Sequence, residues 1–248
     1  MNLSDRQWVI LDEPGAGAET GREFGREIGQ QHSLTIDAFF DFICPWCLIG
    51  KRNLERAVFL FAGLRPDIQV TVRWRSHQLL PYTPLNGLPY QAFYRDRLGG
   101  AEAVAARRAE VLQAGHDAGI EFAFDRIEVL PNTTAAHELV DFAASRVGEV
   151  QRAALIDRLL TAYFMDGENI GDRLVLERLG CDGGLERESL RKHLAQSGDR
   201  FDPTGQRALH ARPGVSGVPH FVFSTGYTFS GVHSPEVMVA LMNSAARH

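Results

Sequence analysis

Two cysteines separated by two residues stand directly after an apolar run, and they constrain the fold more than any other feature of the chain. The run is Ile36–Ile43, and Cys44-Pro45-Trp46-Cys47 follows it at the start of a segment with helical periodicity. Cysteines three positions apart in the first turn of a helix share one face, so their sulfur atoms can reach disulfide distance. The sequence therefore predicts a redox-active dithiol at the start of a helix.

The helix N-terminus predicts different roles for the two sulfur atoms. Unpaired backbone N–H groups and the positive end of the helix dipole stabilise a thiolate, so Cys44 is expected to have a lowered pKa and to attack first. Pro45 suits the first helical position, and Trp46 is expected to be exposed beside the sulfurs. Cys47 is the expected resolving thiol on the buried side of the helix, a side predicted to include Leu54, Val58 and Phe61 but not Lys51, Arg52 and Arg56.

Two other interpretations of the cysteine pair are weaker. A zinc site would need histidines from scattered segments, because the third cysteine, Cys181, has no CxxC partner, and no metal site is predicted. A purely structural disulfide closing so short a loop would gain little stability from chain entropy. Cys181 is expected to be a free thiol.

Composition is that of a globular enzyme, with 248 residues, 44% hydrophobic and 23% charged residues, and a net charge of −5. This mild acidity gives no reason to expect nucleic acid or a membrane as a partner. The segment Met1–Gln31 has acidic residues in place of a basic region followed by an apolar core. We therefore expect a cytoplasmic protein.

The order of predicted elements divides the chain into three parts. Residues 1–33 are expected to be a loosely attached extension. Strands at Leu34–Phe42 and Ile68–Trp74 flank a helix at Pro45–Phe61, which makes a β-α-β unit within residues 34–80. Residues 81–209 have helical periodicity and no convincing strand, so they are expected to form an inserted all-helical domain. Within it, Asn132 or Thr133 is predicted to cap a helix that runs through Val147 and ends at Gly148. Gly167 is predicted to end the next helix, and Asp172 to cap another.

Residues 210–248 return to strand patterns. Phe221–Phe223 and Tyr227–Phe229 flank a short loop with Gly226, which predicts a hairpin. Ser234-Pro235 then begins a last helix with an apolar surface made by Val237, Val239, Leu241 and Met242. The fold class is therefore α/β, a β-α-β and β-β-α core interrupted by helices.

This order and several motifs resemble the DsbA-like proteins of the thioredoxin-fold superfamily, and among them the FrnE-type branch. The motifs are Asp41-Phe42-Ile43-Cys44-Pro45-Trp46-Cys47, Ile49-Gly50-Lys51, Trp74-Arg75-Ser76, Asn132-Thr133 with Ala136-His137, Asn169-Ile170-Gly171-Asp172 and Gly217-Val218-Pro219. The resemblance covers nearly everything from Leu34 onward. It implies a thioredoxin-like core with an inserted helical domain.

The resemblance also implies a function, disulfide oxidoreductase or isomerase, with cysteine-containing proteins or peptides as substrates. In this family the proline that corresponds to Pro219 is cis and faces the dithiol, so Val218 and Pro219 are expected to hold an extended substrate segment. An edge strand would suit such a proline. No cofactor is implied, and a low-molecular-weight thiol or a reductase would be the electron partner.

The chain departs from the family pattern at several positions. Leu48 stands where relatives often have Tyr, His77-Gln78 where Phe-Glu is common, and His220 where Phe is common. A protonated His220 would raise the thiolate fraction at Cys44, or the side chain is simply solvated at the groove rim. Asp41 can relay a proton to Cys47 or simply end the strand, and the second role is preferred.

His137 and Asn169 lie in family motifs, and for both a structural role is preferred. Two rival functions remain open. A kappa-type glutathione transferase or hydroxychromene-carboxylate isomerase shares the architecture but commonly has serine at the first cysteine. A redox-sensing or chaperone-like protein would bind peptides without turnover.

Overall fold

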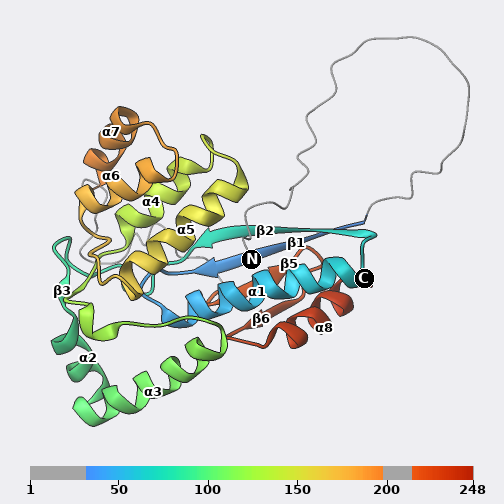
Figure 1. Cartoon of the computed structure of the whole chain (residues 1–248), viewed down its shortest axis with the longest axis horizontal. Helices are drawn as coiled ribbons and strands as arrows, with labels where there is room; N and C mark the ends of the chain where they lie inside the picture. The colour runs from blue at the N-terminus through green and yellow to red at the C-terminus, as the bar shows by residue number, and fades with distance from the viewer. Residues whose placement is uncertain (1–31, 198–213, 248) are drawn as a thin grey trace, which may run out of the picture. The chain divides into compact units, whose positions relative to one another are not determined.

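The computed structural model describes residues 32–197 and 214–247 (Figure 1). Of the predicted extension 1–33, only His32 and Ser33 are described, and they belong to the first strand rather than to an extension. Residues 198–209 of the predicted insertion and residues 210–213 and 248 of the predicted C-terminal half also lie outside the described residues. The domain boundaries therefore stay predictions.

The central sheet has the strand order β2-β1-β5-β6. Strand β1 (His32–Phe40) runs parallel to β2 (Ile68–Ser76), and the two are joined by helix α1 (Pro45–Leu64). Strand β5 (His220–Phe223) lies antiparallel between β1 and β6 (Thr228–Ser230). Both the β-α-β unit and the C-terminal hairpin are thus present as predicted.

Helix α8 (Pro235–Ala245) lies beside α1 (Figure 1). Ser234 caps it through a hydrogen bond from the backbone N–H of Val237, as the Ser-Pro sequence predicts. Its buried side chains include Met238, Val239 and Met242, whereas Val237 is exposed. The prediction for Val237 was wrong because the buried face begins one residue later.

The chain between β2 and β5 is mostly helical, as predicted, and also contains two short strands that were not. Strands β3 (Leu88–Pro89) and β4 (Val129–Leu130) pair antiparallel, and two residues each are too few to give an alternating pattern. Helices α2 (Tyr90–Leu98) and α3 (Ala101–Asp117) lie between them, with a short 3₁₀ turn at Phe124–Arg126.

Helices α4 (Thr134–Ala143), α5 (Glu149–Phe164), α6 (Arg173–Asp182) and α7 (Arg187–Ser197) pack on one another as a second group (Figure 1). Asp172 caps α6 by accepting from Leu174 N–H at 2.7 Å, as predicted. Gly148 was predicted to end a helix through Val147. Instead α4 stops at Ala143 and Gly148 is the N-cap of α5, because glycine serves at either helix end.

Several boundaries differ from prediction by two or three residues. Strand β1 ends at Phe40 rather than Phe42, β2 continues to Ser76, and α1 continues to Leu64. The apolar residues Phe42 and Ile43 are buried in the turn after β1 rather than in the strand. An apolar run indicates which residues are buried, but it does not show at which residue the strand pairing ends.

Lys51 was predicted to lie off the buried side of α1, but it is only 2% exposed. Its ammonium pairs with Glu55 and, at 3.3 Å, with Asp157 of α5, and it lies 5.5 Å from the ring centroid of Trp74. Burial of a lysine requires partners of this kind. They come from a distant part of the chain, so helical periodicity could not reveal them.

Candidate active site

The dithiol lies at the junction of β1 and α1, where the chain turns from strand to helix. Cys44 is the N-cap of α1 in an extended conformation, and Pro45 occupies the first helical position. The backbone N–H of Cys44 donates to the Asp41 carbonyl at 3.2 Å, and that of Cys47 donates to the Cys44 carbonyl at 3.0 Å. These bonds fix both cysteines at the start of the helix, as the sequence predicts.

Trp46 is half-buried and packs against the core, where the sequence predicted exposure. The guanidinium of Arg107, from α3, lies over its indole ring. The insertion therefore covers part of a side chain that would otherwise stand in solvent beside the sulfurs.

The two sulfur atoms have different surroundings. Both thiols are free, and Cys44 is 6% exposed against 2% for Cys47. The Cys44 thiol donates to the backbone carbonyl of Val218 at 3.5 Å. Burial raises the pKa of Cys47. Its hydrogen bond with Cys44 and the charge of Cys44 raise this pKa further, whereas a backbone hydrogen bond from Asp41 lowers it. Cys47 is therefore held in the protonated form behind Cys44.

The peptide bond between Val218 and Pro219 is cis, which agrees with the expectation taken from the family resemblance. A Cβ added to Gly50 of α1 would lie 3.0 Å from Cγ of Pro219, so glycine allows the helix to approach the proline ring. The Pro219 carbonyl accepts from Gly231 N–H at 2.9 Å. Pro219 does not lie in an edge strand as expected, because it precedes β5, which has a neighbour on each side.

His220, the first residue of β5, is paired within the hairpin. Its Nδ1 lies 2.6 Å from Oγ of Ser230, and its ring packs at 6.0 Å from the ring centroid of Phe39. Burial lowers the pKa of His220. The protonated form, which a stabilising charge beside Cys44 would require, is therefore disfavoured at neutral pH.

Asp41 is fully buried immediately after β1 ends. Its carboxylate accepts backbone N–H bonds from Phe42 at 2.8 Å and Leu79 at 2.7 Å, and it lies 3.0 Å from Nε2 of His137 in α4. The Asp41 carboxylate is close enough to Cys47 to raise the pKa of that thiol. Asp41 thus has the preferred role of ending the strand, and it also lies close to the resolving cysteine, Cys47.

The pairing of His137 with Asp41 was not predicted. His137 is also fully buried and packs against the rings of Phe40 and Phe42. Sequence motifs singled out both residues separately, 96 positions apart. Only the packing of α4 against the end of β1 brings them together, and correlated variation among homologues is the signal that would reveal such a contact.

His77 and Gln78, at one of the departures from the family pattern, line the same junction. Gln78 donates to Thr134 Oγ1 at 2.9 Å at the start of α4. His77 is buried, and burial lowers its pKa although the nearby charge of Asp41 opposes the shift. The Gln78 side chain therefore joins the segment after β2 to the insertion.

Three tyrosines of the insertion lie near the site, and the sequence analysis did not identify them. Tyr90 and Tyr94 of α2 contact each other with ring centroids 4.8 Å apart, and Tyr163 of α5 is fully buried. Burial raises the pKa of Tyr94, and the neighbouring Tyr90 and Cys44 raise it further. The tyrosine hydroxyl near the dithiol therefore stays neutral.

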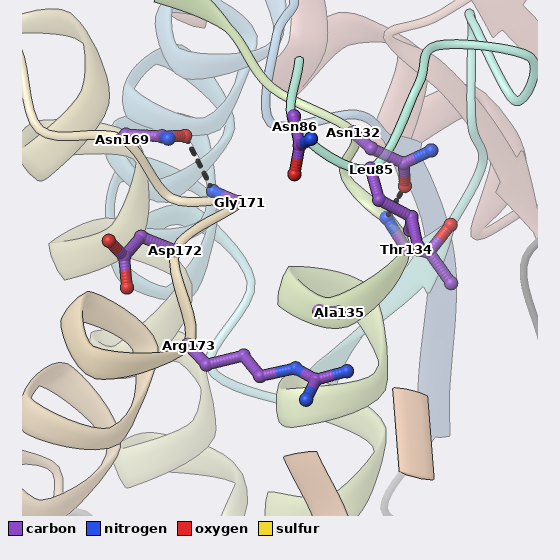
Figure 2. A pocket seen from close by; sticks show the side chains of 9 residues that line it. All are labelled: Leu85, Asn86, Asn132, Thr134, Ala135, Asn169, Gly171, Asp172 and Arg173. Carbon is purple, nitrogen blue, oxygen red and sulfur yellow. Dashed lines mark hydrogen bonds between the residues drawn. The ribbon is translucent and has the colours of Figure 1, made fainter. Parts of the chain in front are cut away.

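The other family motifs of the insertion meet at a separate pocket of about 450 Å³ (Figure 2). Its lining comprises Leu85, Asn86, Asn132, Thr134, Ala135, Asn169, Gly171, Asp172 and Arg173. Asn132 accepts from Thr134 N–H at 2.9 Å and Asn169 accepts from Gly171 N–H at 3.0 Å. These side chains shape the loops before α4 and α6, which supports the structural role preferred for Asn169.

The sequence matches the DSBA-like thioredoxin domain family over residues 35–243, which includes both cysteines and Pro219. The chain belongs to this family. The fold is accordingly the DsbA-like thioredoxin fold, and the family is one of thiol oxidoreductases.

Three individual proteins are similar to this chain. The uncharacterized protein YwbO of Bacillus subtilis is 25% identical over 198 residues, covering 77% of this chain and 86% of YwbO. A probable DsbA oxidoreductase, SCO1869 from Streptomyces coelicolor, is 25% identical with a TM-score of 0.72, covering 86% of this chain and 89% of that one. The cytosolic disulfide reductase DsbM from Pseudomonas aeruginosa, solved with GSH, is 20% identical with a TM-score of 0.57, covering 86% of this chain and all of that one (100%).

Cys181, predicted to be a free thiol, is free and partly exposed in the described structure. No helix within residues 32–197 and 214–247 is both long and apolar enough to cross a membrane.

Proposed function

We propose that this protein is a cytoplasmic thiol–disulfide oxidoreductase or isomerase of the FrnE type, acting on cysteine-containing proteins or peptides. One observation carries the proposal. The Cys44 thiol lies at the carbonyl of Val218, directly before cis-Pro219, while Cys47 is buried behind it with a raised pKa. An attacking sulfur and a protonated resolving sulfur are what sequential exchange requires.

The reaction follows from these positions. The Cys44 thiolate attacks one sulfur of a substrate disulfide, a mixed disulfide forms, and the other substrate sulfur leaves as a thiolate. Cys47 then loses its proton and attacks Cys44, which releases the first substrate sulfur and leaves Cys44–Cys47 oxidised. Two electrons pass from the dithiol to the substrate, and a low-molecular-weight thiol or a reductase would restore them.

Substrate binding is proposed to use the backbone at Val218 and Pro219. Proline has no N–H, so the chain before β5 offers an extended substrate a carbonyl without a competing donor at the next residue. Isomerisation requires only that a second substrate thiol reaches the mixed disulfide before Cys47 does. A cytoplasmic location favours reduction or isomerisation over net oxidation.

The test is alkylation of the reduced protein as a function of pH, with each cysteine assigned by mass spectrometry. Cys44 is expected to be labelled at neutral pH, whereas Cys47 is labelled only at higher pH, because burial holds its proton. Cys44→Ser should abolish exchange with a peptide disulfide, and Cys47→Ser should accumulate a mixed disulfide. The Cys44–Cys47 reduction potential, measured in glutathione buffers, then indicates the net direction.

Three results would contradict the proposal. Equal labelling of both cysteines across the pH range would remove the asymmetry on which it depends. Activity that persists in Cys44→Ser would favour the glutathione transferase or isomerase alternative, in which a bound thiol reacts. Saturable peptide binding without exchange would favour a binding protein.

A further inference from the structure

Arg107 places a positive charge over the ring of Trp46, a residue of the dithiol motif. Its guanidinium carbon lies 5.6 Å from the ring centroid of Trp46, which is two residues beyond Cys44 in the first turn of α1. Arg107 belongs to α3, which packs against α1. A guanidinium stacked on an aromatic face is held in position while the N–H groups at its edge stay available to a ligand.

The guanidinium is accessible, and its acidic partner is replaceable. Arg107 pairs with Glu110 at 2.6 Å, and the two side chains are 57% and 59% exposed. Exposed pairs one helical turn apart contribute only about 0–1 kcal/mol. A carboxylate brought to the dithiol by a substrate can therefore compete with Glu110 for this charge at little cost.

Two other cations of this region, Arg108 and Lys51, are engaged by partners. Arg108 donates to Gln91 at 2.7 Å and lies 3.4 Å from Asp125. The ammonium of Lys51 is shared by Glu55 and Asp157 beneath the surface. Arg107 is thus an exposed cation in contact with a residue that lies between the two cysteines.

The uncharged groups on the same side do not oppose an anion. Burial and the nearby Tyr90 and Cys44 raise the pKa of Tyr94, so its hydroxyl remains neutral. Burial lowers the pKa of His77 and of His220, so neither imidazole supplies a competing charge at neutral pH. The charge of Arg107 persists across the working pH range because a guanidinium does not deprotonate.

We infer that Arg107 selects substrates that carry a carboxylate close to the disulfide sulfur attacked by Cys44. This inference rests on the proposed function and names its substrate class. A guanidinium can bind a carboxylate through two parallel N–H bonds, which fixes the orientation of the substrate as well as its position. Acidic disulfide peptides, small or within a protein chain, have this chemistry.

The test compares two small disulfides, one with free carboxylates and one with esterified carboxylates. Reduced full-length protein is mixed with oxidised glutathione or with its tetraethyl ester, in which all carboxylates are blocked, and a single turnover is followed without added reductant. The wild-type protein should react about fivefold faster with the free acid, as expected for a gain of up to about 1 kcal/mol. Arg107→Glu should abolish or reverse this preference, measured within each variant as the ratio of the rate with the free acid to the rate with the ester.

Three further variants separate the charge of Arg107 from its structural role. Arg107→Lys should keep part of the preference, because it retains the charge but loses the planar fork. Glu110→Gln should increase the preference by releasing Arg107. Arg65→Glu is the control, since it reverses a partly exposed arginine paired with Asp67 at the opposite end of α1, and the preference should be unchanged.

A second pair of probes distinguishes small from polypeptide substrates. Two disulfide-bonded peptides of equal length, with Asp or Asn beside the cysteine, should show the same dependence on Arg107 if the carboxylate can come from a protein chain. If Arg107→Glu leaves the acid-to-ester and Asp-to-Asn ratios unchanged, the inference is overturned although exchange proceeds. Failure of the wild-type protein to react with any of the four disulfides would instead reject the proposed function.

Discussion

The carboxylate of Asp41 occupies a site where an unpaired charge would be strongly destabilising. It is fully buried, and its partners are two backbone N–H groups and His137. Removing one partner of a buried hydrogen-bonded pair leaves the other unsatisfied, which typically costs about 1–3 kcal/mol, and more for a charged group. The pair therefore ties the chain immediately before the dithiol to α4 of the insertion.

A double-mutant cycle measures this tie. His137→Asn should lower the free energy of unfolding by about 3 kcal/mol, because the Asp41 carboxylate stays buried without its imidazole partner. In an Asp41→Asn background the same change should cost at least about 1 kcal/mol less, as measured by urea denaturation of the reduced protein. Strictly additive effects would show that the two side chains do not stabilise each other.

Helix α1 connects the dithiol to the cis-proline through its glycine. Gly50 lies against the Pro219 ring, whereas Gly63 near the end of the same helix has no atoms within 4 Å of an added Cβ. In α1, Gly50 is thus required by the close approach of Pro219, whereas Gly63 faces open space. Only the first is expected to affect the dithiol.

Alanine substitutions at the two glycines should have opposite effects. Gly63→Ala should stabilise the protein by up to about 1 kcal/mol through helix propensity and leave exchange unchanged. Gly50→Ala should not stabilise the protein, because the new methyl group displaces Pro219. The exchange rate of this variant should also fall several-fold. Thermal unfolding and single-turnover exchange measure the two effects, and equal behaviour of both variants would contradict the role assigned to Gly50.

Contacts between the sheet and the helices of the insertion extend over the described molecule. Besides the pair of Asp41 and His137, the Arg152 side chain of α5 donates to the Trp74 carbonyl of β2 at 3.0 Å, and Asp157 of α5 pairs with Lys51. These contacts are partly buried, and they would be lost if the insertion or the thioredoxin-like core unfolded alone. The two halves are therefore coupled energetically.

We expect the reduced protein to unfold in a single cooperative transition. Tryptophan fluorescence, which reports on all three tryptophans including Trp46 in α1 and Trp74 in the sheet, and far-UV circular dichroism, dominated by helices, should give the same urea midpoint. Arg152→Ala should lower both midpoints together. Two separate transitions, with the helical signal lost first, would show that the insertion folds independently of the core.

The family, the fold class and the dithiol were accessible from the sequence because their determinants are local or follow a regular order. The position of Cys44 at a helix start follows from the apolar run and Pro45, and the cap at Ser234 from two adjacent residues. The end of β1 was misplaced because burial continues past its last paired residue, and the end of α4 was misplaced because the chain continues from Ala143 as an exposed turn over residues 144–146. Lys51 was misassigned because its partner Asp157 lies about a hundred residues away.

By itself the sequence determined the strand–dithiol–helix order, the inserted helices and the proline that precedes the final hairpin, since neighbouring residues and spacing carry that information. Only the tertiary structure decided what surrounds the sulfurs. His137 reaches Asp41, Arg107 reaches Trp46, and Gly50 admits Pro219 because distant segments pack together. Burial and charge at a site depend on those long-range contacts, and no local pattern records them.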